Sequence, residues 1–184
     1  MYGIEIPVRI ETLTKQNAEL LQGFSCGNGS IDSYFQQEAA EDATNVTYLF
    51  LDSGKSRVIA CMTIACSAIF YSASSEDDLR PTEKFSSLTP AMEIVFFAVD
   101  ESYQHIPYTK RSSFTLSQIL FSYMIDRMRD ISHTVIGAKV VVLYSVPEAV
   151  HFYERCSFKA FGDSMNGDVG YFVEGCTPMY YHLN

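Results

Sequence analysis

The sequence predicts a single mixed α/β domain, in which helices cover a β-sheet. The predicted elements follow in the order strand, helix, helix, three strands, helix, strand, helix and two final strands. Three consecutive strands favour hairpin or meander pairing, and the strand–helix–strand that follows favours a parallel pair. Hydrophobic residues make up 47% of the 184 residues, which is enough apolar surface for a core. We therefore expect residues 1–184 to form one domain.

The first part of the chain is predicted to hold one strand and two helices. Residues 6–13 read as a strand, and residues 14–23 as a helix. Residues 26–29 have the sequence Cys-Gly-Asn-Gly, which predicts a turn because Gly and Asn tolerate positive φ. Ser30 is then the predicted N-cap of a helix over residues 31–43, whose apolar residues recur at helical spacing.

Three strands are predicted next. Residues 45–52 and 57–71 form two of them, joined by Ser-Gly-Lys-Ser. This tetrapeptide resembles the end of a phosphate-binding loop, but the earlier glycine is missing and a strand follows, so we expect a plain hairpin turn. Residues 72–90 are polar and read as a surface loop, either solvated or part of a ligand-binding wall. Residues 91–99 form an apolar third strand.

The last part of the chain begins with the clearest helix. Its apolar stripe consists of Leu116, Ile119, Leu120, Tyr123, Met124 and Met128. A β-branched strand over residues 138–146 follows, and Pro147 suits the first position of a helix over residues 148–156. Residues 157–161 and 178–183 are the final strand candidates.

Charge and composition exclude several classes of protein. The net charge of −9 disfavours a nucleic-acid partner, because such partners are held by basic surfaces, whereas it is compatible with a cationic acceptor such as an amine. The five cysteines include no C-x-x-C pair, and the histidines lack metal-ligand spacing, so neither a disulfide framework nor a metal site is expected. The sequence shows neither a signal peptide nor a membrane span, and we expect a cytoplasmic protein.

One strand carries the first sign of a known family. Residues 92–100 read Met-Glu-Ile-Val-Phe-Phe-Ala-Val-Asp, which resembles the fourth strand of the GNAT superfamily of N-acetyltransferases. The resemblance implies a mixed, mostly antiparallel sheet with helices on both faces and a splayed strand pair. It also implies that the backbone of Phe97, Ala98 and Val99 pairs with the pantetheine arm of acetyl-CoA, and that Glu93 matches the general base of the histone-acetyltransferase branch.

The strand pattern agrees in part with a catalytic role for Glu93. Alternation places Glu93 on the same face as Val95, Phe97 and Val99. A carboxylate on an apolar face should be desolvated, which suits it to take a proton from an ammonium group. The alternative is a carboxylate at the entrance of a strand, facing water.

The loop after this strand departs from the family. Val99 and Gln104 have the V-x-x-x-x-Q spacing, but the glycines that the family places before the next helix are absent. Either other donors hold the pyrophosphate at the helix start, or cofactor binding is weak or lost; we favour the first. The residues then expected to bind the cofactor are Gln104, Lys110, Arg111, Ser112, Ser113 and Thr115.

The segment over residues 142–158 is similar to the late strand and F-Y-x-x-x-G-F helix of the family, with Ser157 in place of the glycine. By resemblance, Tyr153 matches the tyrosine that protonates the departing coenzyme A thiolate, and the alternative is a core tyrosine. Ser145 lies where the family contacts the cofactor, although it could equally be a helix N-cap.

Together these segments imply an acetyl-CoA-dependent N-acetyltransferase that acts on a primary amine. An inactive GNAT-fold binding or regulatory domain is the alternative that the missing glycines suggest. Residues 24–35 are similar to a segment of GNAT-type toxins that acetylate charged transfer RNA, which makes tRNA a partner only under that interpretation. Exposed strand edges near the C-terminus would allow a homodimer.

Overall fold

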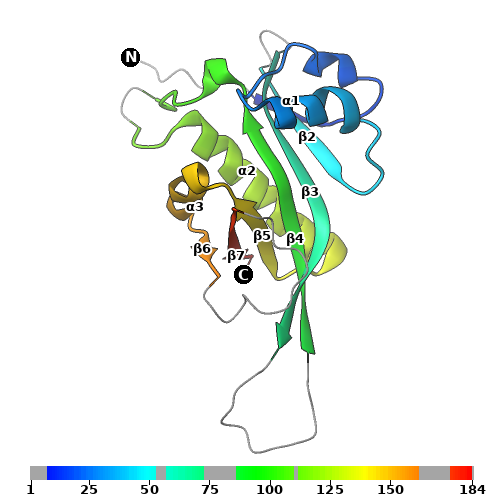
Figure 1. Cartoon of the computed structure of the whole chain (residues 1–184), viewed down its shortest axis with the longest axis vertical. Coiled ribbons are helices and arrows are strands. Elements are labelled where there is room, and N and C mark those ends of the chain that lie inside the picture. Colours follow the sequence, from blue (N-terminus) through cyan, green and yellow to red (C-terminus); the bar gives the residue numbers. More distant parts are fainter. Residues whose placement is uncertain (1–7, 53–56, 73–85, 110–111, 162–174, 184) are drawn as a thin grey trace, which may run out of the picture. The chain divides into compact units, whose positions relative to one another are not determined.

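The computed structural model describes residues 8–52, 57–72, 86–109, 112–161 and 175–183 (Figure 1). The chain forms two compact units. Unit 1 comprises Met1–Ala65 and Ile94–Arg127, and unit 2 comprises Cys66–Glu93 and Met128–Asn184. Two long strands and one helix contribute residues to both units, so each unit is described separately.

Unit 1 holds the N-terminal part of the sheet, in the order β1-β2-β3-β4. Its strands are β1 (Val8–Thr12), β2 (Val46–Asp52), part of β3 (Arg57–Ser72) and part of β4 (Ser86–Val99). Its helices are two 3-10 turns (Ala18–Leu21 and Glu101–Tyr103), α1 (Gly29–Ser33) with a π turn (Tyr34–Glu38), and most of α2 (Leu116–Ile131). The β1–β2 and β2–β3 pairs are antiparallel, which confirms the pairing predicted for β2 and β3.

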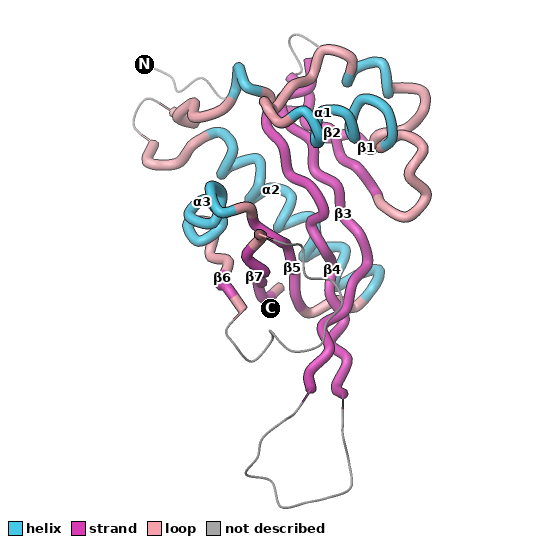
Figure 2. The backbone as a smooth tube through the Cα atoms, viewed as in Figure 1, coloured by secondary structure: helices cyan, strands magenta, loops and turns pink. Residues whose placement is uncertain are grey.

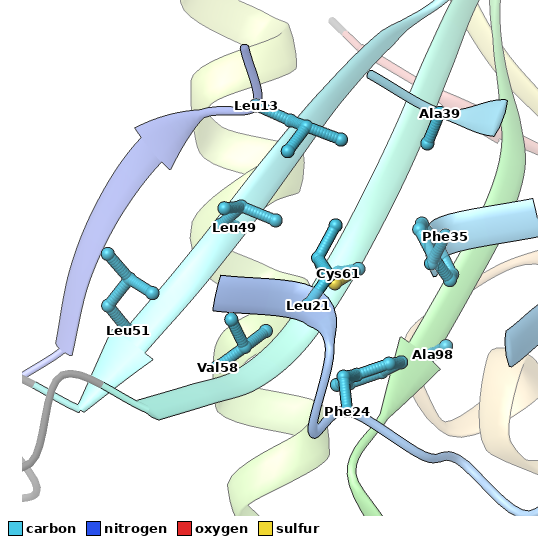
Figure 3. Close-up of a cluster of buried hydrophobic side chains, with 10 residues drawn as sticks. All are labelled: Leu13, Leu21, Phe24, Phe35, Ala39, Leu49, Leu51, Val58, Cys61 and Ala98. Atoms are coloured by element: carbon cyan, nitrogen blue, oxygen red, sulfur yellow. The ribbon is translucent and has the colours of Figure 1, made fainter. Parts of the chain in front are cut away.

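A β-bulge between β2 and β3 shapes the core of unit 1. Leu49 lies opposite Cys61 and Leu51 opposite Val58, so two steps along β2 match three steps along β3. The extra residue, Ile59, lets Val58 and Cys61 share a face, although simple alternation would separate them. The core cluster consists of Leu13, Leu21, Phe24, Phe35, Ala39, Leu49, Leu51, Val58, Cys61 and Ala98 (Figure 3).

Helices cover both faces of the sheet in unit 1. The segments that carry Leu21 and Phe35 lie in front of the strands in Figure 3, and α2 lies behind them. On the α2 side, the guanidinium of Arg127 lies 5.1 Å from the ring centre of Tyr48. This arrangement is the one that the sequence predicted.

The turn before α1 is capped differently from the prediction. The side chain of Asn28 accepts hydrogen bonds from the backbone N–H groups of Ser30 (3.1 Å) and Ile31 (3.3 Å). Asn28, rather than Ser30, is therefore the N-cap, because its side-chain oxygen reaches the first free donors of the helix. The helical run also ends at Glu38 instead of Ala43. Further along the chain, the carboxylate of Asp42 accepts from the N–H groups of Thr44 and Asn45 and shapes the turn before β2.

The predicted helix over residues 14–23 is reduced to the 3-10 turn over Ala18–Leu21. The side-chain oxygen of Asn17 accepts a 2.7 Å hydrogen bond from the N–H of Thr14, so these residues form a local turn first. Such side-chain bonds compete with helix formation, which explains the shortened element.

Unit 2 holds the other part of the sheet, in the order β3-β4-β5-β7-β6 (Figure 2). Its further strands are β5 (Val140–Ser145), β6 (Lys159–Ala160) and β7 (Thr177–His182). Its helical segments are the end of α2, a π turn (Ser132–Ile136), a 3-10 turn (Pro147–Ala149) and α3 (Val150–Arg155). β7 is antiparallel to both β5 and β6.

Two predictions for these elements need correction. β4 begins at Ser86, so residues 86–90 belong to a strand and not to the predicted surface loop; residues 73–85 lie outside the described residues. Tyr123 was assigned to the buried stripe of α2 but is 56% exposed, because Phe121 takes a buried position instead. Gly137 ends the helical run with a φ of 64°.

We predict that Gly27→Ala destabilises the protein by about 1–2 kcal/mol. Gly27 has a φ of 83°, and an added Cβ would lie 3.1 Å from a carboxylate oxygen of Glu101. The matched control is Gly23→Ala, because a Cβ at Gly23 meets nothing within 4 Å. Urea unfolding of both variants measures the difference, and an equal stability of the two would contradict the strain argument.

Candidate functional site

The residues predicted for the site are divided between the two units. Glu93, Ser145 and Tyr153 belong to unit 2. The predicted cofactor residues of unit 1 are Phe97, Ala98, Val99, Gln104, Ser112, Ser113 and Thr115. Lys110 and Arg111 lie outside the described residues. The predicted residues are therefore described within the unit to which they belong.

A polar network holds the end of β4 in unit 1. The N–H of Asp100 donates to the carbonyl of Ile59 at 2.9 Å, and its buried carboxylate accepts from the N–H of Ser102 at 3.1 Å. Arg57 donates to both carboxylate oxygens of Asp100, at 3.1 and 3.3 Å, and lies over the ring of Tyr103. The strand therefore stops at Val99, and the chain turns at once into a 3-10 helix. Sequence reasoning missed this network, although an aspartate directly after an apolar strand is a usable signal.

Gln104 joins this strand end to the turn before α1. Its side-chain nitrogen donates to the carbonyl of Val99 and to the carbonyl of Cys26, both at 2.9 Å. The N–H of Glu101 donates to the carbonyl of Ser25 at 2.9 Å and reinforces the contact. Gln104 thus stabilises the contact between the end of β4 and the turn before α1 in unit 1. Its role in cofactor binding stays a prediction.

The glycine-free loop turns at His105. This residue has a φ of 59°, the left-handed conformation that histidine adopts more readily than most non-glycine residues. Beyond it, the N–H of Tyr108 donates to the carbonyl of Phe114 at 3.0 Å, and the N–H of Leu116 donates to the carbonyl of Ile106 at 2.8 Å. The loop is closed by its own backbone hydrogen bonds, so it does not need glycine to form.

Thr115 and Ser112, both predicted to bind the cofactor, differ in whether their hydroxyl groups can still donate a hydrogen bond to an anion. Thr115 and Gln118 form a capping box: the N–H of Thr115 donates to the Gln118 side chain at 2.9 Å, and the N–H of Gln118 donates to the Thr115 hydroxyl at 3.3 Å. The hydroxyl of Ser112 accepts from the N–H of Phe114 at 2.9 Å, which leaves its own hydrogen able to donate. Ser112 is therefore better suited than Thr115 to bind an anion.

Along β4, the predicted alternation holds in the middle of the strand. Met92 and Ile94 are buried, whereas Glu93 and Val95 are half-buried on the other face. Phe97 is half-buried and packs edge-on against Phe121 of α2 at 5.1 Å. Glu93 is thus neither fully desolvated nor freely exposed.

Tyr153 of α3 lies among aromatic rings in unit 2. Its ring packs against Phe152 at 5.1 Å and against Phe158 at 6.0 Å. Burial, with a smaller contribution from Cys156, raises the pKa of Tyr153 well above its ordinary value. The phenol is protonated at neutral pH and can donate a proton or a hydrogen bond.

Ser145 is buried at the end of β5. Its hydroxyl donates to the carbonyl of Val146 at 2.9 Å. The N-cap position before Pro147 belongs to Val146, so the alternative that Ser145 caps this helix is wrong. The hydroxyl is already used by the neighbouring backbone, and cofactor contact by Ser145 stays a prediction.

Sequence reasoning missed Tyr144, which lies next to Ser145 on β5. Burial raises the pKa of the Tyr144 phenol, and the negative charge of Glu93 raises it further. The two side chains therefore lie close enough in unit 2 for one to act on the other. No sequence signal identifies this pair, because 51 positions separate Glu93 from Tyr144.

Ser157 stands after α3, where the F-Y-x-x-x-G-F pattern has glycine, and its backbone adopts a conformation that favours glycine. Ser157 has a φ of 69°, the left-handed region that favours glycine after a helix. The N–H of Phe158 donates to the carbonyl of Tyr153 at 3.0 Å, as expected at such a helix end. Ser157 keeps the turn geometry at a cost in backbone strain.

In the described part of the chain, no helix has the length and apolar character needed to span a membrane, and no group of His, Cys, Asp or Glu could hold a metal ion. All five cysteines are free thiols.

Comparison with known proteins shows the fold. No protein-family model matches the sequence, and no curated protein matches it significantly. Among solved structures, AtaTR bound with acetyl-CoA matches with a TM-score of 0.72 at 15% identity, covering 96% of this chain and 94% of that one. A bacterial toxin matches with a TM-score of 0.68 at 18% identity, covering 96% and 91%. AtaT in complex with acetyl-methionyl-tRNAfMet matches with a TM-score of 0.66 at 16% identity, covering 96% and 95%. These matches confirm the GNAT-like α/β fold.

We predict that Ser157→Gly stabilises the protein by up to about 1 kcal/mol, because glycine adopts a positive φ without strain. Ser122→Gly is the control: Ser122 is exposed within α2, where glycine should cost about 0.5 kcal/mol. Thermal unfolding of both variants tests the prediction. A loss of stability in Ser157→Gly would contradict the strain assigned to this turn.

Proposed function

We propose that this protein is an acetyl-CoA-dependent N-acetyltransferase that transfers the acetyl group to a primary amine. The observation that carries the proposal is the likeness over 96% of the chain to a toxin complex that contains acetyl-CoA. Free cysteines are compatible with the cytoplasmic location that the proposal includes.

The reaction assigns a task to each of two side chains of unit 2. The amine nitrogen attacks the thioester carbon, forming the C–N bond while the C–S bond breaks. Glu93, directly or through water, accepts the proton that the nitrogen loses, and Tyr153 donates a proton to the departing thiolate. The raised pKa of Tyr153 keeps the phenol protonated at neutral pH, so a proton is present for the departing thiolate.

The cofactor side of the proposal rests on unit 1. Backbone groups of Phe97, Ala98 and Val99 would pair with the pantetheine arm, and the hydroxyl of Ser112 would donate to the pyrophosphate. The carbonyl of Val99 already accepts from Gln104, so the pairing groups should lie upstream of it. The remaining predicted contacts are Gln104, Lys110, Arg111, Ser113, Thr115 and Ser145.

Tyr153→Phe tests the mechanism. We expect the rate of acetyl transfer to fall about 10²–10⁴-fold, because the variant lacks the proton donor, while acetyl-CoA binds with unchanged affinity. The control is Tyr123→Phe, which changes an exposed tyrosine of α2 and should leave both quantities unchanged. Stopped assays of thiol release and calorimetry with acetyl-CoA provide the two measurements.

The inactive-domain alternative makes a different prediction for the same experiments. If the wild-type protein binds no acetyl-CoA at high micromolar concentration, the enzyme proposal is wrong. If it binds acetyl-CoA but Tyr153→Phe transfers the acetyl group at the wild-type rate, the acid belongs elsewhere.

A second candidate function is a toxin that acetylates aminoacyl-tRNA and is neutralised by a partner protein. Its support is the likeness to AtaT solved with acetyl-methionyl-tRNAfMet and to AtaT bound to the C-terminus of the antitoxin AtaR. The net charge of −9 argues against an RNA substrate. Residues 24–35 add little, because Asn28 caps α1 and Asp32 accepts from Ser25 and Cys26.

Induced expression in bacteria separates this candidate from the first. A toxin should arrest growth, and Tyr153→Phe should restore it. Healthy growth with an active enzyme would exclude the toxin function and leave acetyl transfer to another amine.

A further inference from the structure

Two polar side chains of unit 2 are half-buried although their neighbours along the strand are buried. On β4, Glu93 is half-buried between Met92, which is 1% exposed, and Ile94, which is 3% exposed. On β5, Tyr144 is half-buried between Leu143, at 2%, and Ser145, at 1%. A carboxylate and a phenol placed in this way are costly in a core, and their partial exposure leaves both able to meet a ligand.

The sheet brings these two side chains together. β4 and β5 are neighbours in the strand order, and the N–H of Lys139 donates to the carbonyl of Pro90 at 2.9 Å. Ala91 of β4 packs with Val140 and Val142 of β5 in one buried cluster, and strand alternation places Glu93 on the face of Ala91 and Tyr144 on the face of Val142. The raised pKa of the Tyr144 phenol, to which the Glu93 charge contributes, agrees with this placement.

The chemistry of the pair suits a primary ammonium group. Such a group carries one positive charge and three N–H donors, whereas the pair offers carboxylate oxygens and a phenol oxygen as acceptors. The negative charge disfavours an anionic ligand, and the net charge of −9 attracts a cation toward the protein.

We propose that Glu93 and Tyr144 together bind the ammonium group of the acceptor before acetyl transfer. The inference rests on the proposed function, and it adds Tyr144 as a positioning residue. Glu93 then holds the charged amine and later accepts its proton, while Tyr144 fixes the direction in which the nitrogen faces. The recognised chemistry is the primary amine itself, whichever larger molecule carries it.

Amine binding can be measured without any reaction. In the full-length protein labelled with ¹³C at the tyrosine Cζ atoms, Tyr144→Phe removes one of twelve signals and thereby assigns it. We expect ethylamine near neutral pH, where it is protonated, to shift the Tyr144 signal in a saturable way. Tetramethylammonium, a cation without N–H donors, should shift it much less.

Substitutions of Glu93 and Tyr144 test the role of each residue in amine binding. Glu93→Gln should weaken ethylamine binding about tenfold or more, because it removes a charge-assisted hydrogen bond. Tyr123→Phe should leave the titration unchanged. In steady-state assays, Tyr144→Phe should raise the KM for the amine about tenfold with a smaller change in kcat, a split that a general loss of structure would not produce.

The outcomes separate this inference from the proposed function. If acetyl-CoA binds but ethylamine leaves the Tyr144 signal unchanged up to about 100 mM, well above typical substrate levels, the pair is not the amine site. If ethylamine shifts the Tyr144 signal of Glu93→Gln as strongly as that of the wild-type protein, the proposed amine site is also wrong. If ethylamine binds through the pair but acetyl-CoA does not bind, the amine site stands and the acetyltransferase proposal fails.

Discussion

The carboxylate of Asp100 is the constraint on which the geometry of unit 1 depends. It is only 3% exposed, and a buried charge without partners would cost several kcal/mol. The guanidinium of Arg57 and the N–H of Ser102 offset that cost by donating to this carboxylate, which directly follows the end of β4 at Val99. Gln104 then ties the same strand end to the turn at Cys26. The start of the predicted cofactor loop is therefore set by buried electrostatics.

Two turns of this chain, one in each unit, form without glycine. His105 and Ser157 both adopt positive φ, at 59° and 69°, in places where the backbone must reverse. The loop beyond His105 is closed by two backbone hydrogen bonds and a capping box at Thr115. These hydrogen bonds offset the local backbone strain. They also occupy backbone N–H groups at the start of α2 that could otherwise bind an anion.

Unit 2 supplies the acid–base groups of the proposed reaction. Burial raises the pKa of both Tyr144 and Tyr153, so both phenols keep their protons at neutral pH. They differ in their surroundings, because Tyr153 lies among aromatic rings and Tyr144 lies near the charge of Glu93. One phenol is suited to protonate a leaving group, and the other to orient a cation beside a carboxylate.

Local patterns in the sequence determined the elements whose stability comes from neighbouring residues. Most of the apolar stripe of α2 and the strands β2 and β3 follow from periodicity, which acts over a few positions. The family-like strand and helix also lead to the prediction that Glu93 and Tyr153 are catalytic.

Only the tertiary structure decided which distant groups meet. The bulge at Ile59 depends on strand register, and the bond from Gln104 to Cys26 joins residues 78 positions apart. The approach of Glu93 to Tyr144 depends on the order of β4 and β5 in the sheet. Local propensity carries no information about these contacts, because their free energy is gained only when separate segments pack together.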